Sequence, residues 1–342
     1  MSLVWVCGQD RGGVEDDTST EEFARSVHEL ALSLCACHTY LQVLQDHKEA
    51  SMDECVWKVI RVAIRSAGRS IPRTGRRPHY GDELILKMFF WSVAHDRPLC
   101  WACRRNSYSR IMRPRAIPSV SQFCKRLKSP RIEAIIRRVH ELLAGLDEPI
   151  ALAYIDGKAL PISESSKDPD ARSGRGNGRF SLGYKLHALG DSYGRIRALV
   201  IRPLNEGESP IAHEHLVKHI SPGALVLADG NYDGRELYTQ VGEQGACLLT
   251  PQKKNKRTDA ALRKTSPERR AAIEFWRDEP KLAWTIYGWR SGIERIFSAL
   301  SCYGGGLGPL PAWVRRLERV DRWVTAKVAL YNARVLLRMD PS

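Results

Sequence analysis

The feature that most constrains the fold is an apolar run that ends in an acid and then occurs a second time. The first run, residues 150–155, is followed by Asp156, the second, residues 224–228, is followed by Asp229, and a glycine comes directly after each acid. Short apolar runs bounded by turn residues are typical of strands buried on both faces. The two runs therefore predict two central strands of one sheet, each delivering a carboxylate at its carboxyl end.

The chain around these runs alternates between patterns of strand and helix. Residues 180–189 alternate apolar and polar side chains, and a Gly-Asp-Ser-Tyr-Gly turn joins them to a second such stretch, 195–202, which predicts a hairpin. Residues 161–179 are rich in Ser, Gly, Asp and Arg and predict a loop. The pattern also predicts a strand at 245–250 and helices at 209–219, 234–242 and 286–300. This order indicates an α/β fold, a mixed sheet with helices on both faces.

The residues before the sheet predict an all-helical region. Helical signals occur at 21–49, 53–66, 83–94, 98–105, 119–127 and 132–143. The chain is therefore expected to divide into a helical extension at 1–70, a helical region resembling a helix-turn-helix unit at 71–148, an α/β domain at 149–310 with a basic insertion at 251–281, and a C-terminal helix at 311–342. For the second region, DNA contact and plain helix packing stay equally open.

The composition favours a polyanionic partner. There are 53 Lys and Arg against 39 Asp and Glu, which gives a formal net charge of +14. Nucleic acid is the first partner that such a charge suggests, although a solvated basic surface produces the same count. No apolar run approaches the roughly 20 residues of a membrane span, so no membrane partner is expected. The nine cysteines are scattered along the chain, which is typical of a reducing cytoplasm.

The two aspartates could share a metal ion if their strands are neighbours. Adjacent strands lie about 4.8 Å apart, and Mg²⁺ prefers a few carboxylates with water and phosphate oxygens around it. A third acid, Glu294, lies on the predicted helix 286–300 and would complete the set. A single Asp-Gly pair more often marks a turn. Its repetition after two similar strands favours a metal site formed by Asp156, Asp229 and Glu294.

A resemblance to a known family rests on two motifs. The segment Tyr287-x-x-Arg290-x-x-x-Glu294 resembles the Tyr-Arg-Glu-Lys signature of DDE-type bacterial insertion-sequence transposases, in the group that contains insertion sequences four and five. Residues 180–187, Phe-Ser-Leu-Gly-Tyr-Lys-Leu-His, are similar to the second strand of that group. The resemblance covers about 150–302. It implies a ribonuclease-H-like fold, metal-dependent phosphodiester cleavage at element ends, and transfer of the 3′-hydroxyl into target DNA.

By position, the resemblance makes Asp156, Asp229 and Glu294 the catalytic and metal-binding acids, holding Mg²⁺ or Mn²⁺, two ions when DNA is bound. It implies that Tyr287 and Arg290 contact DNA, and the spacing places both on one helix face with Glu294. A plain Arg290–Glu294 ion pair is the alternative. The basic residues expected to follow the DNA backbone are Lys253, Lys254, Lys256 and Arg257. The expected partners are double-stranded DNA and a second copy of the chain, in a homodimer on paired ends within the nucleoid.

One position departs from the family signature. The signature ends in a lysine seven residues after the glutamate, and Ser301 stands there instead. Arg295, Arg315 and Arg316 are the candidates for supplying that charge. Two other functions stay open, a metal-dependent nuclease of the same fold without strand transfer, and a catalytically inactive DNA-binding relic.

Overall fold

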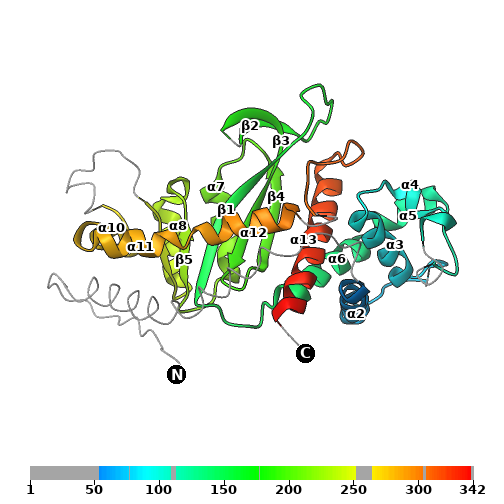
Figure 1. The fold of residues 1–342 in the computed structure, drawn as a ribbon, viewed down its shortest axis with the longest axis horizontal. Helices are drawn as coiled ribbons and strands as arrows, with labels where there is room; N and C mark the ends of the chain where they lie inside the picture. The colour runs from blue at the N-terminus through cyan, green and yellow to red at the C-terminus, as the bar shows by residue number, and fades with distance from the viewer. Residues whose placement is uncertain are drawn as a thin grey trace.

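The two acid-bearing runs form neighbouring strands at the centre of a six-stranded mixed sheet (Figure 1). The strands are β1 (Leu152–Pro161), β2 (Arg172–Gly176), β3 (Arg179–Asp191), β4 (Ile196–Pro203), β5 (Leu225–Ala228) and β6 (Cys247–Leu249). β1 pairs antiparallel with β3 and parallel with β5, while β4 pairs antiparallel with β3 and β6 pairs parallel with β5. The order is β4-β3-β1-β5-β6, with β2 also paired to β3, and this mixed sheet surrounded by helices confirms the predicted α/β fold class.

The computed structural model describes residues 54–339 except 77, 109–112, 177, 252–263 and 303–305. The predicted helix at 21–49 lies outside the described residues. Within them, no helix is both long and apolar enough to cross a membrane. In Figure 1, the helices that precede the sheet gather at one end of the molecule, and α10 (Pro267–Asp278) and α11 (Pro280–Gly288) lie at the other end.

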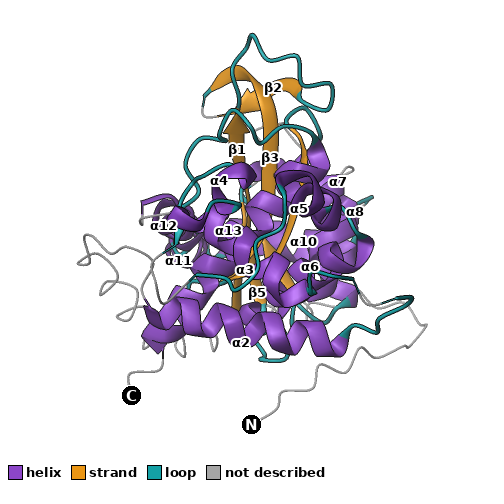
Figure 2. Ribbon diagram, turned by 90° about the vertical axis from the view of Figure 1, so that its right-hand side faces the viewer, coloured by secondary structure: helices purple, strands orange, loops and turns teal. Residues whose placement is uncertain are grey.

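The segment predicted as a loop at 161–179 contains a strand. β2 pairs antiparallel with the first part of β3, from Arg172 opposite Gly183 to Gly176 opposite Arg179. This two-stranded ribbon extends beyond the rest of the sheet (Figure 2). The loop prediction is wrong because the segment is polar and Gly-rich, so its strand propensity is low, and its conformation comes from pairing with β3.

Helices cover both faces of the sheet, as predicted. Tyr154 and Gly157 are three residues apart in β1, so their side-chain positions face opposite sides. Tyr154 packs against Gly292 of α12 (Ser291–Cys302), so tightly that a Cβ on Gly292 would lie 2.6 Å from the tyrosine ring. Gly157 lies against Glu208 of α7 (Glu208–Ile211). α7 continues through a π-helical turn at Ala212–Leu216, and α8 (Arg235–Glu243) packs beside β6.

One buried acid links several segments of the helical region before the sheet. Its helices are α2 (Glu54–Ser70), α3 (Asp82–Ala94), α4 (Leu99–Ala102), α5 (Val120–Leu127) and α6 (Pro130–Ala144). Asp82 accepts hydrogen bonds from Arg73 at 2.6 Å, from Arg131 at 2.9 Å and from Arg126. The arginine-rich segment before α3 is therefore bound to the rest of the protein through Arg73. Ser119 caps α5, which lies in the predicted helix 119–127, in a capping box with Gln122.

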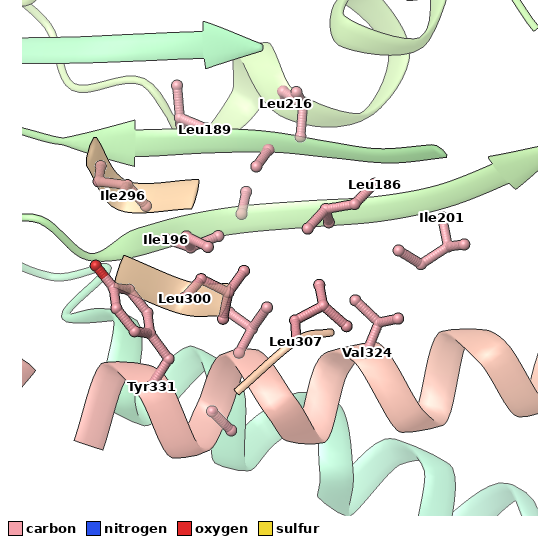
Figure 3. Packing of buried hydrophobic residues seen from close by; sticks show 14 of the residues in the cluster. Leu186, Leu189, Ile196, Ile201, Leu216, Ile296, Leu300, Leu307, Val324 and Tyr331 are labelled. Carbon is pink, nitrogen blue, oxygen red and sulfur yellow. The ribbon is translucent and has the colours of Figure 1, made fainter. Parts of the chain in front are cut away.

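The helix α13 (Leu317–Met339) joins this region to the sheet. It packs against α2, α6 and β4, and it begins at Leu317 rather than near Pro311 as predicted. Asn332 is fully buried and both donates to and accepts from the backbone of Ile196, at 2.9 and 3.0 Å. The helix therefore satisfies backbone groups at the outer edge of β4. Figure 3 shows the apolar side chains between the strands and α13, among them Leu186, Ile201, Leu300, Leu307 and Val324.

Candidate active site

Asp156 and Asp229 lie side by side where the parallel pairing of β1 and β5 ends. The last paired residues are Ile155 and Ala228, and each directly precedes one of the two acids. Because neighbouring strands are about 4.8 Å apart, both carboxylates emerge at the same place on the sheet. One detail differs from the sequence-based expectation. β1 does not end at Asp156 but continues to Pro161, since it stays paired with β3.

Arg290 lies in a break between two helices. The predicted single helix 286–300 is wrong, because α11 ends before Arg290 and α12 begins after it. Tyr287 therefore lies on α11 and Glu294 on α12, not on one helix face. The turn brings Arg290 Nη2 to 2.9 Å from Asp156 Oδ2 and Nη1 to 3.0 Å from Glu294 Oε1. One guanidinium thus bridges two of the three predicted acids.

The electrostatic setting of Asp156 disfavours its ionised form. Its side chain is only 15% exposed, and Oδ1 accepts a hydrogen bond from the Gly157 N–H at 2.8 Å. Burial raises the pKa of Asp156 to about 6, Arg290 and the Gly157 N–H act against the rise, and the nearby Asp229 and Glu208 add to it. A single shared arginine is therefore too little positive charge for the acids around it. A further cation at this position would stabilise the ionised carboxylate.

Asp229 lies at the start of a short turn, and its carboxylate is hydrogen-bonded within that turn. Its carboxylate accepts from the Asn231 backbone N–H at 2.8 Å and from Asn231 Nδ2 at 3.1 Å. Burial raises the pKa of Asp229 as well, the Asn231 N–H lowers it, and Glu208 raises it further. Two adjacent acids with raised pKa values are typical of functional sites, where charged groups are held together before a ligand arrives.

Glu208 is a fourth acid at this site, and the sequence analysis missed it. Its side chain is 15% exposed, and its two oxygens accept from Lys185 Nζ at 2.7 Å and from Asn231 Nδ2 at 3.3 Å. Glu208 also contributes to the raised pKa values of Asp156 and Asp229. It reaches the site because α7 crosses over β1. The only local signal was an acid at the first residue of a helix that follows a strand of the sheet.

The hydroxyl of Tyr232 points into the same cluster. Tyr232 is fully buried, and its hydroxyl has no hydrogen-bond partner in the described part of the chain. Burial raises the pKa of Tyr232 well above its usual range, and Glu208, Asp156 and Asp229 add to the effect. The residue is therefore a neutral donor among acids. Unpaired buried hydroxyls are costly, so this one suits a water or ligand oxygen held between the carboxylates.

Tyr287 belongs to an aromatic cluster at the edge of the site. Its ring centroid lies 5.8 Å from that of Trp276 and 6.0 Å from that of Trp284. Trp284 is 61% exposed although it is one of the largest apolar side chains. Exposed aromatic rings beside a cationic group are able to stack on unpaired bases.

The other predicted residues are not part of this cluster. Lys253, Lys254, Lys256 and Arg257 lie outside the residues that the structure describes. The Ser301 hydroxyl donates to the Phe297 carbonyl at 2.8 Å. Arg316 pairs with Asp170 at 3.5 Å, and Arg315 donates to nearby carbonyl oxygens, so both are engaged away from the acids.

The donor set fits a divalent cation through its two aspartates. Asp156 and Asp229 offer hard oxygen ligands, and their raised pKa values reflect a shortage of positive charge. In the described residues, no three His, Cys, Asp or Glu side chains are grouped closely enough to hold a metal ion. Glu294 is instead paired with Arg290. It would join the aspartates only after this pair separates.

Comparisons with known proteins place transposases among the proteins similar to this chain. Residues 149–306 match the family model described as the transposase DDE domain. A stretch of 89 residues, 24% of this chain and 27% of the relative, is 39% identical to the transposase for insertion sequence element IS1106 of Neisseria meningitidis serogroup B. A solved piggyBac transposase synaptic complex with hairpin DNA aligns with 84% of this chain and 73% of its own, at 11% identity and a TM-score of 0.41. Residues 149–306 of this chain are thus similar to the DDE domain of transposases.

Proposed function

We propose that the chain is an active DNA transposase, which cuts phosphodiester bonds at element ends and joins the freed 3′-hydroxyl to target DNA. The observation that carries the proposal is the position of Asp156 beside Asp229 on neighbouring strands, both partly buried and both with raised pKa values. Acids held in this way gain from binding a divalent cation, and phosphodiester transfer is chemistry that such cations support.

The acids have separate roles in this proposal. Asp156, Asp229 and Glu294 hold Mg²⁺ or Mn²⁺, two ions when DNA is present. When bound, the metal supplies activation of the attacking oxygen and charge stabilisation of the leaving oxygen. When DNA binds, Arg290 breaks its contacts with the acids and contacts the DNA backbone, because its planar guanidinium binds two phosphate oxygens at once. This exchange releases Glu294, whose side chain is 64% exposed and has room to turn toward the aspartates.

The DNA contacts extend beyond the acids. Tyr287 and the exposed Trp284 offer rings for the strand near the cut, and the basic residues at 253–257 follow its backbone. The helices at 71–148 hold the element end. Joining two ends in one reaction requires two active sites, so the working form is a homodimer on paired ends, in the nucleoid of the cytoplasm.

The test is cleavage of a duplex that carries the terminal inverted repeat flanking the gene. With Mg²⁺ or Mn²⁺, we expect the wild-type chain to nick this duplex at the element end and to join it to target DNA. Asp156→Ala and Asp229→Ala should abolish both steps and keep most of the DNA binding measured in EDTA. Asp278→Ala is the matched control, because Asp278 is exposed on α10 and pairs only with the neighbouring Arg277 among the ion pairs of the described chain.

Each other outcome identifies a different error. If Asp156→Ala cleaves like the wild type, the assignment of the acids is wrong. If the wild type cuts but never joins, the chain is a nuclease of the same fold. If the wild type binds the duplex and never cuts it, the chain is a DNA-binding relic.

A further inference from the structure

Lys158 lies on the same face of β1 as Asp156. The two residues are two apart in the strand, so their side chains project from one side. Tyr154, two residues earlier, packs on Gly292 of α12, and Asp156 contacts Arg290 just before that helix. Lys158 continues the row, with its Nζ 5.8 Å from the centre of the Phe297 ring on α12. The strand thus presents an acid and then a lysine to the same side of the site.

Lys158 has no acidic partner in the described residues. Its Nζ lies over the face of Phe297, and the Cys302 thiol is near enough to affect the pKa of the ammonium. The side chain is nevertheless partly buried. Two other cations beside the site each have a carboxylate, since Lys185 pairs with Glu208 and Arg290 with Asp156. Burying an ammonium without a counter-charge is costly, so the arrangement makes sense when an anion approaches from solution.

The Lys158 ammonium also lies beside the face of α12 on which Ser301 stands in place of the lysine of the family signature. Phe297 is three residues after Glu294 and four before Ser301, so the three follow one face of α12. Lys158 reaches this face from the strand at Phe297, and its second neighbour, Cys302, is adjacent to Ser301 in sequence. A positive charge is therefore present near position 301 although the helix does not carry it.

We propose that Lys158 binds a backbone phosphate of the DNA next to the phosphodiester that is cut. The proposal rests on the function proposed above and adds a residue that neither the acids nor the motif include. Two residues of strand advance about 6.6 Å, so Lys158 reaches a phosphate beside the one that lies at Asp156. The bound phosphate supplies the counter-charge that the protein lacks, and the contact fixes the register of the strand over Asp156.

The test uses the salt dependence of DNA binding, measured with the full chain, the inverted-repeat duplex and EDTA. Losing one phosphate contact lowers the slope of log K against log salt concentration by about 0.9. We expect this loss in Lys158→Met, which keeps the apolar stem on Phe297. Lys158→Arg should retain the slope. Lys218→Met removes the same charge from an exposed position on the face covered by α7, and it should also retain the slope.

A second variant tests whether position 301 serves the same phosphate. We expect Ser301→Lys to restore the slope in the Lys158→Met background, because a lysine there extends along the α12 face that Lys158 contacts. Thermal unfolding checks that Lys158→Met folds, and its Tm should equal or exceed that of the wild type, because an unpaired charge is removed. A wild-type slope in folded Lys158→Met would overturn the role of Lys158 alone. Failure of the wild type to bind the duplex would overturn the proposed function itself.

Discussion

Two aspartate–arginine pairs on this sheet differ in how completely they are enclosed. Asp191 and Arg195 are both fully buried at the β3–β4 hairpin, where Asp191 accepts from the Arg195 N–H at 2.8 Å and from Nε at 2.9 Å. Asp156 and Arg290 are 15% and 17% exposed, and Arg290 is shared with the outward Glu294. The first pair joins residues four apart in sequence, and the second joins residues 134 apart.

The difference separates a structural pair from a reactive one. The Asp191 carboxylate has two short contacts to Arg195, and Arg197 Nη1 lies 3.8 Å from its Oδ2, so two cations lie beside it. Asp156 has two acidic neighbours and one cation that it does not hold alone. A buried acid whose charge is balanced by cations maintains the fold. A buried acid with too little positive charge around it gains free energy when a cationic ligand binds.

The largest expected effect is the loss of the enclosed pair. Asp191→Ala leaves Arg195 and Arg197 buried without their shared acid, and we expect it to lower the free energy of unfolding by about 3–5 kcal/mol. Asp156→Ala should leave stability within about 1 kcal/mol of the wild type or increase it. Urea unfolding of the two variants measures both values. Equal losses in the two variants would remove the distinction between the pairs.

Divalent ions should stabilise the protein only through Asp156, the acid of the less enclosed pair. At an ion concentration one hundred times Kd, Mn²⁺ is expected to raise the free energy of unfolding by about 2.7 kcal/mol. The gain should disappear in Asp156→Asn. It should also weaken below about pH 6, because the pKa of Asp156 lies there and a protonated acid is a poor ligand. Thermal shifts with and without EDTA at pH 5 and pH 8 measure this, and an undiminished shift in Asp156→Asn would place the ion elsewhere.

The pH dependence of stability should show the free-energy cost of ionising Asp156 when no metal is present. The folded pKa of about 6 lies above the usual value of 3.8 for an aspartate, so folding favours the protonated acid, and stability falls as the pH rises from about 4 to 6. Asp156→Asn does not carry this cost. We expect it to exceed the wild type by about 1–3 kcal/mol at pH 8 and to match it below about pH 4. Urea titrations across this range make the comparison, and a constant difference at all pH values would contradict it.

The smallest expected effect on stability comes from Glu294, the exposed acid that shares Arg290 with Asp156. Glu294 is 64% exposed, and exposed pairs four residues apart contribute only tenths of a kcal/mol. Glu294→Gln should therefore change the free energy of unfolding by less than about 0.5 kcal/mol, while cleavage of the inverted-repeat duplex is lost. A large destabilisation would mean that Glu294 belongs to the structural pairs and not to the site.

The sequence was sufficient where local patterns decide the structure. The hairpin of β3 and β4, the apolar strands before Asp156 and Asp229, and the capped helix α5 all followed from residues close together in the chain. The continuation of β1 past Asp156 did not, because Gly157 and Lys158 interrupt the apolar pattern and only the pairing with β3 keeps the strand extended. The β2 strand was missed for the same physical reason.

The site was harder to predict than the sheet. The break before α12 had a local signal in Gly288 and Gly292, which disfavour helix, but the contact between Arg290 and Asp156 is encoded by no local pattern. Glu208 resembles any other surface glutamate in sequence, and it becomes part of the cluster only because α7 crosses β1. Sequence spacing identified the acids that strands deliver, and it missed the acid that a crossing helix delivers.

The contact between Asn332 and Ile196 has a consequence for how the protein is made. These residues are 136 apart, and at about 5–20 residues per second the ribosome needs roughly 7 to 27 s to travel between them. During that interval the outer edge of β4 lacks the helix that covers it. The nascent chain can therefore form the acid-bearing strands early, but it completes the sheet only when α13 has emerged, so premature release before that helix should yield an aggregation-prone product.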